Sequence, residues 1–468
     1  MIESNDEGFQ LPRGWICTTI GKVIKNIPLT GKKLKQSQYK NNGMLPVIDQ
    51  GQNFIGGYTD KNELKVNVKM PVVIFGDHTK VLKFVDFDFV AGADGIKVLE
   101  PLEILNPRLF YYFLSAIKLP EKGYARHFQF LEKSLIRIPP LSEQRRIVAK
   151  MDELYSYLDI GVESLWKVKA QLKRYRQAVL KYAFEGKLTE EWRKTHKDQI
   201  KPIQKLLKSI KEKNGQVREN RTKSEIIDKY QPEALPENWV WSSIGKISEL
   251  ISGQHIMKNN YNQNQKGVPY LTGPEDFRLK YPLITKWTIK PKVIANYNDV
   301  LVTVKGAGVG KTNILNIKEA AISRQLMAIR SQIINSDYIY YFLQHVFSDL
   351  RKLGSGSTVP GIRREQILLF PIPLTIINEQ DIIVKEIEAR LSIVDEIEKI
   401  TEQSLKQSER LRQSILKKAF EGGLTPQDPT DEPAERLLER IKEERKKYEI
   451  GIDDKSALRQ VELVRFVK

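Results

Sequence analysis

RQAVLKYAFEGKLT, residues 176–189, occurs again as RQSILKKAFEGGLT at residues 412–425. The two stretches agree at ten of fourteen positions. Self-similarity at a fixed separation is the sequence signature of a repeated architecture. This pair therefore indicates that the chain contains two copies of one structural plan.

Further matches extend the duplication on both sides of this pair. LPRGWICTTIGKV (11–23) has its counterpart in LPENWVWSSIGKI (235–247), and YYFL occurs at 111–114 and at 340–343. PLSEQRRIVAKMDEL (140–154) corresponds to PLTIINEQDIIVKEIEARL (373–391), with Thr375, Ile376 and Ile377 inserted. The matches keep the same order in both halves and nearly the same separation. A unit of about 230 residues is therefore duplicated.

The first part of each copy predicts short strands. Residues 11–140 and 235–373 are rich in Val, Ile, Tyr, Phe and Thr, with runs such as MPVVIFG (70–76) and DVLVTVKG (299–306). Gly, Asn-Gly and Pro interrupt these runs at short intervals, which is typical of strands joined by turns. We expect an α+β domain with a mixed sheet and one or two helices in each copy.

The second part of each copy predicts a long helix with one apolar stripe. Steps of three, four and seven residues form a heptad seam, which requires a partner. Ser142 is the expected N-cap and Gly186 the expected C′ residue. The first stripe is Ile147, Met151, Leu154, Leu158, Leu165, Val168, Leu172, Tyr175, Val179 and Tyr182; the second is Ile383, Ile387, Leu391, Val394, Leu405, Leu411 and Ile415, ending at Gly422-Gly423.

One such helix alone would be read as part of a buried hairpin, but two related helices favour a coiled coil that separates two globular heads. The stretch from Ile147 to Tyr182 would be roughly 54 Å long at 1.5 Å per residue. Antiparallel pairing would give pseudo-twofold symmetry, with the heads at opposite ends. A DNA turn of about 34 Å is of the same order, so two heads could meet one face of a duplex.

The predicted fold class is α+β, with two tandem-repeated recognition domains separated by two long helices in an antiparallel coiled coil and a circular, pseudo-twofold arrangement. The expected segments are a first head at 1–140, a first long helix at 141–190, a basic helical linker at 191–234, a second head at 235–373, a second long helix at 374–425, and a tail at 426–468 that completes the repeat.

Composition favours a globular protein that meets a polyanion. The chain has 468 residues, 41% hydrophobic and 29% charged, with a formal charge of +18. A surplus of this size attracts nucleic acid, although a solvated basic surface would also produce it. Residues 193–229 hold 12 Lys and Arg against 5 Asp and Glu. Cys17 is the one cysteine, and the polar, acidic start resembles no secretory signal, so we expect a cytoplasmic protein.

The LPxxW opening of each half, the PL-x-EQ entry to a long helix and the AFEGxLT exit resemble the specificity subunits of type I restriction-modification systems. The likeness covers nearly the whole chain. It implies a non-catalytic subunit whose two target-recognition domains each read one half of a split DNA site. The helices would set the gap between the halves and dock two methyltransferase subunits, and motor-nuclease subunits could join for cleavage. S-adenosylmethionine for adenine methylation, ATP and magnesium would belong to those partners.

Two departures from the family pattern are expected to matter. The insertion Thr375–Ile377 could change the angle of the second head. The tail after Thr425 is expected to fold back and imitate the segment that follows the first helix, which would close the structure into a ring.

Motifs for chemistry of its own are weak. Asn106-Pro107-Arg108-Leu109-Phe110 has Arg where the tetrad of an adenine methyltransferase needs a second Pro. KGAGVGKT (305–312) ends like a P-loop, but Lys305 stands where the first Gly is required, so a strand-turn-strand tip with outward lysines is favoured. The five histidines show no metal-type spacing.

Forked donors and acceptors on loops are the side chains that read base edges, whereas lysines more often hold phosphates. For any one of them, a solvated loop side chain is an equal alternative. The candidates in the first head are Lys32, Lys33, Lys35, Gln50, Gln52, Asn53, His78, Lys80, Arg126, His127 and Gln129; those in the second are Gln254, His255, Lys258, Lys305, Lys311, Arg324, Gln325, Arg363 and Arg364.

Other surfaces and functions stay open. The outer face of the coil and the basic segment 193–229 could dock a methyltransferase or contact phosphates, and the sequence does not separate the two. A coiled-coil scaffold whose heads bind protein is the chief alternative to a DNA-binding subunit, and a self-contained ATP-using enzyme is the third.

Overall fold

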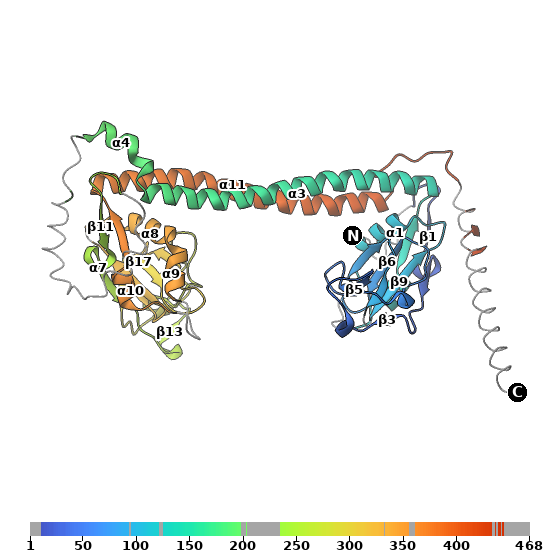
Figure 1. Ribbon diagram of the computed structural model, residues 1–468, viewed down its shortest axis with the longest axis horizontal. Coiled ribbons are helices and arrows are strands. Elements are labelled where there is room, and N and C mark those ends of the chain that lie inside the picture. Colours follow the sequence, from blue (N-terminus) through green and yellow to red (C-terminus); the bar gives the residue numbers. More distant parts are fainter. Residues whose placement is uncertain are drawn as a thin grey trace. The chain divides into compact units, whose positions relative to one another are not determined.

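The computed structural model describes residues 11–92, 95–120, 125–197, 203, 235–331, 333–354, 361–432, 436, 439–440 and 442–443. The chain divides into two compact units, 1–165 with 402–468, and 166–401. Each unit contains one strand-rich head and one half of each long helix (Figure 1). Each unit is therefore built from segments far apart in the sequence.

The head of unit 1 is the predicted α+β domain with mixed sheets. Its two four-stranded sheets have the orders β2-β9-β6-β7 and β3-β8-β4-β5, and β1 pairs with β10. β8 is parallel to both β3 and β4, and the other pairs are antiparallel. The elements are β1 (Ile16–Thr19), β2 (Ile24–Ile27), β3 (Lys33–Leu34), β4 (Leu45–Ile48), β5 (Gly57–Thr59), β6 (Val72–Gly76), β7 (Leu82–Val85), β8 (Val90–Gly92), β9 (Ile96–Pro101), α1 (Pro107–Ala116), α2 (Phe128–Lys133) and β10 (Leu135–Ile138).

The head of unit 2 repeats this plan, but its described residues form the four helices α7 to α10 where one or two were expected. The sheet β12-β20-β17-β18 corresponds to β2-β9-β6-β7, and the parallel pair β14–β19 corresponds to β4–β8 within a sheet of order β13-β15-β14-β19-β16. The elements are β11 (Val240–Ser243), α7 (Ile244–Ile247), β12 (Glu249–Ser252), β13 (Tyr261–Asn262), β14 (Val268–Leu271), β15 (Trp287–Thr288), β16 (Ile294–Asn296), β17 (Val300–Thr303), β18 (Thr312–Ile314), β19 (Glu319–Ile322), β20 (Leu326–Arg330), α8 (Ser336–His345), α9 (Phe347–Leu353), α10 (Arg364–Leu368) and β21 (Pro371–Leu374).

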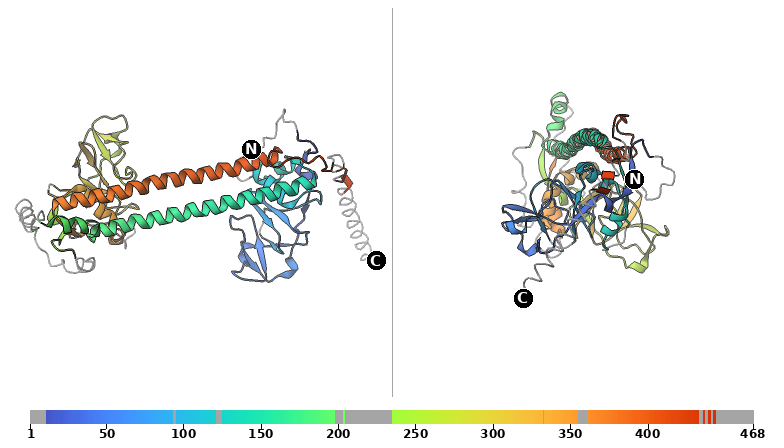
Figure 2. Two further views of the ribbon diagram at one scale, coloured as in Figure 1. Left: turned by 90° about the horizontal axis from the view of Figure 1, so that it is seen from above. Right: turned by 90° about the vertical axis from the view of Figure 1, so that its right-hand side faces the viewer.

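The long helices are α3 (Leu141–Phe184) and α11 (Ile377–Phe420), each of 44 residues. They lie side by side and run in opposite directions within each unit (Figures 1 and 2). α3 begins at Leu141, so Ser142 lies in the first turn and is not the N-cap. Gly186 and Gly422 both have left-handed backbone, with φ of 72° and 74°, as a helix-terminating C′ residue requires. A short helix, α4 (Glu190–Thr195), follows α3.

Each head packs its core against the paired half-helices. In unit 1 the core includes Met151 of α3 and Phe420 of α11, and in unit 2 it includes Phe184 of α3 and Ile387 of α11. The ring centroids of Phe113 and Phe420 lie 4.8 Å apart, and those of Phe342 and Phe184 lie 5.2 Å apart. The AFEG segment that closes one copy in the sequence therefore packs on the head of the other copy.

Three residues of the predicted apolar seam are corrected. Tyr175, Tyr182 and Leu411 are each 48% exposed and do not lie in it. For Tyr175 and Leu411 the physical reason is that an arginine, Arg176 or Arg412, occupies the seam position one residue further on. The other predicted seam residues are buried or half-buried: Ile147, Met151, Leu154, Leu158, Leu165, Val168, Leu172, Val179, Ile383, Ile387, Leu391, Val394, Leu405 and Ile415.

The expected insertion before α11 is wrong as placed. β10 ends at Ile138 and α3 begins at Leu141, while β21 ends at Leu374 and α11 begins at Ile377. Both helices thus start after the same two-residue connection. The change in offset lies further upstream, between the α1/α8 helices and the β10/β21 strands, so Thr375–Ile377 is no extra hinge.

Two broader findings concern the described residues alone. None of their helices is both long enough and apolar enough to cross a membrane. They also contain no group of His, Cys, Asp or Glu arranged to hold a metal ion. Most of the basic segment 193–229 and of the tail beyond 432 lies outside the described residues.

Candidate nucleic-acid interface

Three segments of the first head meet at one end of its sheets. The β4–β5 loop (49–56) is bound to the β6–β7 turn, because Thr79 Oγ1 donates to Gln50 O at 2.8 Å and His78 N donates to Gln50 Oε1 at 3.4 Å. Asp77 then holds the segment before α2: its carbonyl accepts from His127 N at 2.9 Å and its carboxylate from Phe128 N at 2.8 Å. The structure thus brings together candidates that are far apart in the sequence.

The candidates of this head differ in their surroundings. Gln52, Asn53, Arg126 and Gln129 are exposed or half-buried at the loop surface, and Gln50, His78 and Lys80 are half-buried. Lys32 donates to Glu63 O at 2.7 Å, while Lys33 lies on β3 and Lys35 precedes a short helical turn.

One candidate in this head is corrected. His127 is fully buried, and its Nδ1 lies 3.1 Å from Asp77 O. A side chain enclosed in this way holds loop segments together and presents nothing to a ligand, so the expectation of a DNA contact fails for it.

The second head assembles an equivalent set of loops. Val304 N donates to Gln325 O at 2.8 Å, and Ile362 N donates to Val304 O at 2.8 Å, so the β17–β18 tip touches both the β19–β20 turn and the segment before α10. Ser323 Oγ donates to Thr272 O at 2.5 Å, which adds the loop after β14. The two heads therefore gather corresponding loops at corresponding places.

The candidates of the second head mostly lie in this assembly. Lys305 and Lys311 are exposed on the strand-turn-strand tip between β17 and β18. Arg364 Nη1 donates to Ser252 Oγ at 3.1 Å, and Gln254 N donates to Ile322 O at 3.0 Å. The remaining candidates are exposed or half-buried loop side chains: His255, Lys258, Arg324, Gln325 and Arg363.

Two cations near these loops escaped the sequence analysis. Lys97 lines a cleft of about 470 Å³ together with Lys33, and its Nζ lies 5.2 Å from the centroid of the Phe128 ring. Arg278 lines a cleft of about 340 Å³ together with Lys311. Lys97 lies inside a strand, and only its alternation with the buried Ile96 and Val98 could have marked it as outward-facing.

Two arginines in the helix seam form matched ion pairs. Arg176 of α3 lies 2.5 Å from Asp395 and 3.4 Å from Glu398 of α11 in unit 2. Arg412 of α11 pairs with Asp159 of α3 in unit 1. The step forward along α3 from Asp159 to Arg176 is as long as the step back along α11 from Arg412 to Asp395. Both units therefore use one antiparallel register, and related residues carry it.

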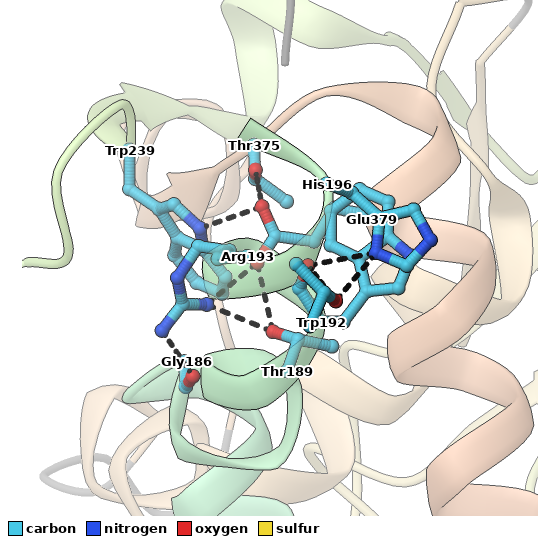
Figure 3. Close-up of polar contacts among 9 residues, drawn as sticks. Gly186, Thr189, Trp192, Arg193, His196, Trp239, Thr375 and Glu379 are labelled. Carbon is cyan, nitrogen blue, oxygen red and sulfur yellow. Dashed lines mark hydrogen bonds and ion pairs between the residues drawn. The ribbon is translucent and has the colours of Figure 1, made fainter. Parts of the chain in front are cut away.

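The LPxxW and EQ motifs meet at the junction of each head with the helices. In unit 2, Trp239 Nε1 donates to Glu379 Oε2 at 3.0 Å (Figure 3). Thr189 and Arg193, which follow the end of α3, donate to Glu379 Oε1 at 2.7 and 2.6 Å. Thr375 also donates to this carboxylate. The helix entry, the helix exit and the head opening are thus joined through one buried acid.

Unit 1 has the same junction with different charges. Trp15 Nε1 donates to Glu143 Oε2 at 3.0 Å. Arg146, one turn into α3, makes two hydrogen bonds to Asp431, which follows the end of α11. Burial raises the pKa of Glu143, while the Trp15 hydrogen bond and Arg146 oppose that shift. The described residues that follow α11 therefore reach the entry of α3 through Asp431.

The glutamine of each EQ motif fixes the neighbouring head helix. Asn106 N donates to Gln144 Oε1 at 2.7 Å, and Asn335 N donates to Gln380 Oε1 at 3.2 Å. Both asparagines cap a head helix, α1 or α8. The motif thus aligns the head with the long helix in both copies.

A second polar contact joins each head to a long helix. The hydroxyl of Tyr112 donates to Asp152 beside Arg108, and burial together with Asp152 raises the pKa of Tyr112 to about 12. In unit 2, Lys280 lies 2.5 Å from Glu388 and 2.7 Å from Asp337.

Comparison with known proteins assigns this architecture. The family model described as the type I restriction modification DNA specificity domain matches residues 12–169 and 236–407. The chain belongs to this family. As a type I specificity protein it carries the domain twice, in agreement with the duplication.

Curated relatives extend over nearly the whole length. The Escherichia coli type I restriction enzyme EcoDI specificity subunit is 26% identical over 465 residues, covering 93% of this chain and 96% of its own. The EcoKI specificity subunit of Escherichia coli strain K12 is 25% identical over 483 residues, with the same coverage. No relative of this kind supports heads that bind protein.

Solved structures show the same fold. A chain from a type I restriction-modification system, studied for its complex assembly and conformational transition, superposes with a TM-score of 0.61 at 21% identity over 89% of this chain and 100% of that one. The HsdS subunit from Thermoanaerobacter tengcongensis gives a TM-score of 0.50 at 22% identity over 89% and 99%.

Proposed function

We propose that the protein is the non-catalytic subunit that selects DNA sites for a type I restriction-modification complex, with each head reading one half of a bipartite site. The observation that carries this is the pair of DNA specificity domains, each with exposed amide, arginine and lysine side chains on loops that hydrogen bonds hold together. Amides and arginines would read base edges, and lysines would hold phosphates.

The long helices would set the spacing between the half-sites. Each unit fixes the same antiparallel register through related Arg–Asp pairs, so the pairing has one defined length. A change of whole heptads in both helices keeps the seam in phase and changes only that length.

The outer face of the helix pair would dock two methyltransferase subunits. Exposed large apolar side chains of the two long helices include Tyr157 and Ile160 in unit 1, and Trp166, Ile393 and Ile400 in unit 2. Exposed large apolar side chains on a charged helix surface favour a protein interface. Tyr157 and Ile393 are related by the duplication, as two equivalent docking surfaces require.

The partners would supply the chemistry and the compartment would be the cytoplasm. S-adenosylmethionine would serve the methyltransferases, and ATP and magnesium would serve the motor-nuclease subunits. The role of this chain would be to bring these partners to double-stranded DNA at a chosen sequence.

Mapping methylated bases tests the proposal. The chain is co-expressed with its cognate methyltransferase, and modified adenines are mapped on a plasmid library of random sequence. A split motif with methyladenine in both halves is expected, and random or absent methylation would contradict the proposal. Replacing residues 235–373 with the second head of a relative should change one half only. Removing one heptad from each helix should shorten the gap and keep both halves.

A further inference from the structure

Lys83 is a buried lysine beneath the β4–β5 loop of the first head. It lies on β7 opposite Ile74 of β6, and 3% of its side chain is exposed. Ile74 and Val85 of the same core are buried beside it. A charged group is rarely enclosed unless it is paired and hydrogen-bonded, so this lysine requires a partner.

Its partners belong to the β4–β5 loop. Lys83 Nζ donates to Asn53 O at 2.6 Å and lies 3.6 Å from Asp49 Oδ1. The same carboxylate oxygen accepts from Gly51 N at 2.9 Å. Burial lowers the pKa of Lys83, and Asp49 opposes that shift. One ammonium group therefore holds both the start and the middle of the loop.

The rest of the loop is anchored so that this contact fixes its tip. Ile48 and Ile55, at its two ends, pack in the core beside Lys83. Gly56 and Gly92 leave room for Asp49, because a Cβ on either would come within 2.6 or 2.7 Å of its side chain. The side chains of Gln52 and Asn53 remain exposed. The tip is thus rigid at its backbone and open at two amide side chains.

The second head has no buried charge at the related position. Its corresponding strand, β18, is Thr312-Asn313-Ile314 and carries no lysine. Asn313 stands opposite Leu301 as Lys83 stands opposite Ile74. It is buried and uncharged, and its Nδ2 donates to Arg278 O at 3.0 Å in the loop after β14. Any effect of Lys83 on sequence reading should therefore be confined to one half of the site.

We propose that Lys83 is a positioning residue for base reading: it holds the loop 49–56 so that Gln52 and Asn53 meet the base edges of one half-site in a fixed geometry. The inference rests on the proposed function. Readout by forked side chains needs a support fixed to within a fraction of an ångström. A loosened tip would accept several bases where the native loop accepts one.

The test compares Lys83→Met with Lys65→Met in the full complex. Methionine keeps the length and the apolar stem of the side chain and removes its charge. Lys65 is the matched control because it forms an exposed ion pair with Asp88 on the same head. Methylation of plasmid sites carrying one mismatch in either half is measured. Lys83→Met should raise methylation at mismatches in one half about tenfold or more and leave the other half unchanged.

Asp49→Asn keeps the oxygen that accepts from Gly51 N and weakens only the ion pair with Lys83. This variant tests the positioning role if Lys83→Met does not fold. It should loosen the same half-site to a smaller extent. If the variants leave methylation at mismatched sites unchanged, or raise it equally in both halves, the positioning role is overturned. The proposed function would still stand as long as the wild type methylates a bipartite motif. A wild type without a bipartite motif overturns both.

Discussion

In each unit an ion pair joins the end of one long helix to the start of the other, but the order of the charges is reversed between the units. In unit 2 the arginine, Arg193, follows the helix exit, and the acid, Glu379, lies at the helix entry. In unit 1 the arginine, Arg146, lies near the helix entry, and the acid, Asp431, follows the exit. Both arrangements tie an exit to an entry, but the partners cannot be exchanged.

The reversed order of charges distinguishes the end of α3 from the end of α11, which the repeated AFEGxLT motif would otherwise make alike. If the exit of α11 met the entry of α11, Asp431 would lie near Glu379 without a counter-charge, because Ile382 stands there at the position of Arg146. If the exit of α3 met the entry of α3, Arg193 would lie beside Arg146 as well as Glu143. Repulsion of like charges disfavours such pairings, whether within one chain or between two. The difference teaches that a duplicated chain needs local asymmetry to select one arrangement of equivalent parts.

Replacing Glu379 or its counterpart Glu143 with glutamine should give the largest difference in stability between the two junctions. Glu379→Gln leaves Arg193, with 15% of its side chain exposed, without its counter-charge, and we expect a loss of about 3–5 kcal/mol in unfolding free energy. Glu143→Gln should cost under about 1 kcal/mol, because burial already disfavours the charge of Glu143. Chemical denaturation of both variants measures the difference, and equal losses would refute the distinction.

Exchanging the charges of unit 1 sharpens the comparison. Arg146→Asp and Asp431→Arg should each destabilise by about 1–2 kcal/mol, because each places two like charges together at a part-buried contact. The double variant should recover most of the loss. The coupling energy from a double-mutant cycle is the measurement, and a coupling near zero would show that the pair has no role in selecting the junction.

The sequence predicted the repeated plan because hydrophobic periodicity and motif identity are local signals. LPxxW, EQ and AFEG each marked an element boundary, and the structure shows that they meet at one junction in each unit. Their contact was not predictable, because it joins residues such as Trp239 and Glu379 that lie 140 positions apart. Local patterns give elements, whereas partners depend on tertiary packing.

The misplaced seam residues have a similar explanation. Tyr175 and Leu411 continue the apolar stripe by sequence, yet Arg176 and Arg412 occupy the seam. An apolar count favours the hydrophobic neighbour, whereas an arginine can lay its stem along the seam and place its charge at the edge beside an aspartate. His127 misled in the opposite way, since its polar neighbours suggested a loop surface but its ring is enclosed.

Acid pH should destabilise the second head but not the first, because only the second head has a histidine, His345, at this position. Burial against Phe184 lowers the pKa of His345, so the folded state binds fewer protons than the unfolded state as pH falls below about 6.5. Stability of unit 2 should therefore be full above that pH and fall below it. Ala116 stands at the related position of the first head. His345→Gln should remove this pH dependence from thermal unfolding curves, and an unchanged slope would contradict the assignment.

The smallest effect should come from the seam arginines, and here the two units should agree. Arg176→Met removes the contacts to Asp395 and Glu398, and Arg412→Met removes the contact to Asp159. These ion pairs are part-exposed, so we expect about 0.5–1 kcal/mol from either change in thermal or chemical unfolding. Arg412 also lies 4.5 Å from the centroid of the Tyr155 ring, which methionine can still cover, so this contact should not separate the two. Equal stability losses at the two seam arginines, together with unequal losses at the two junctions, would show that both units fix the helix register alike. The choice of which helix end meets which helix start would then depend on the junctions. A loss several times larger for one arginine would mean that one unit alone sets the register of both helices.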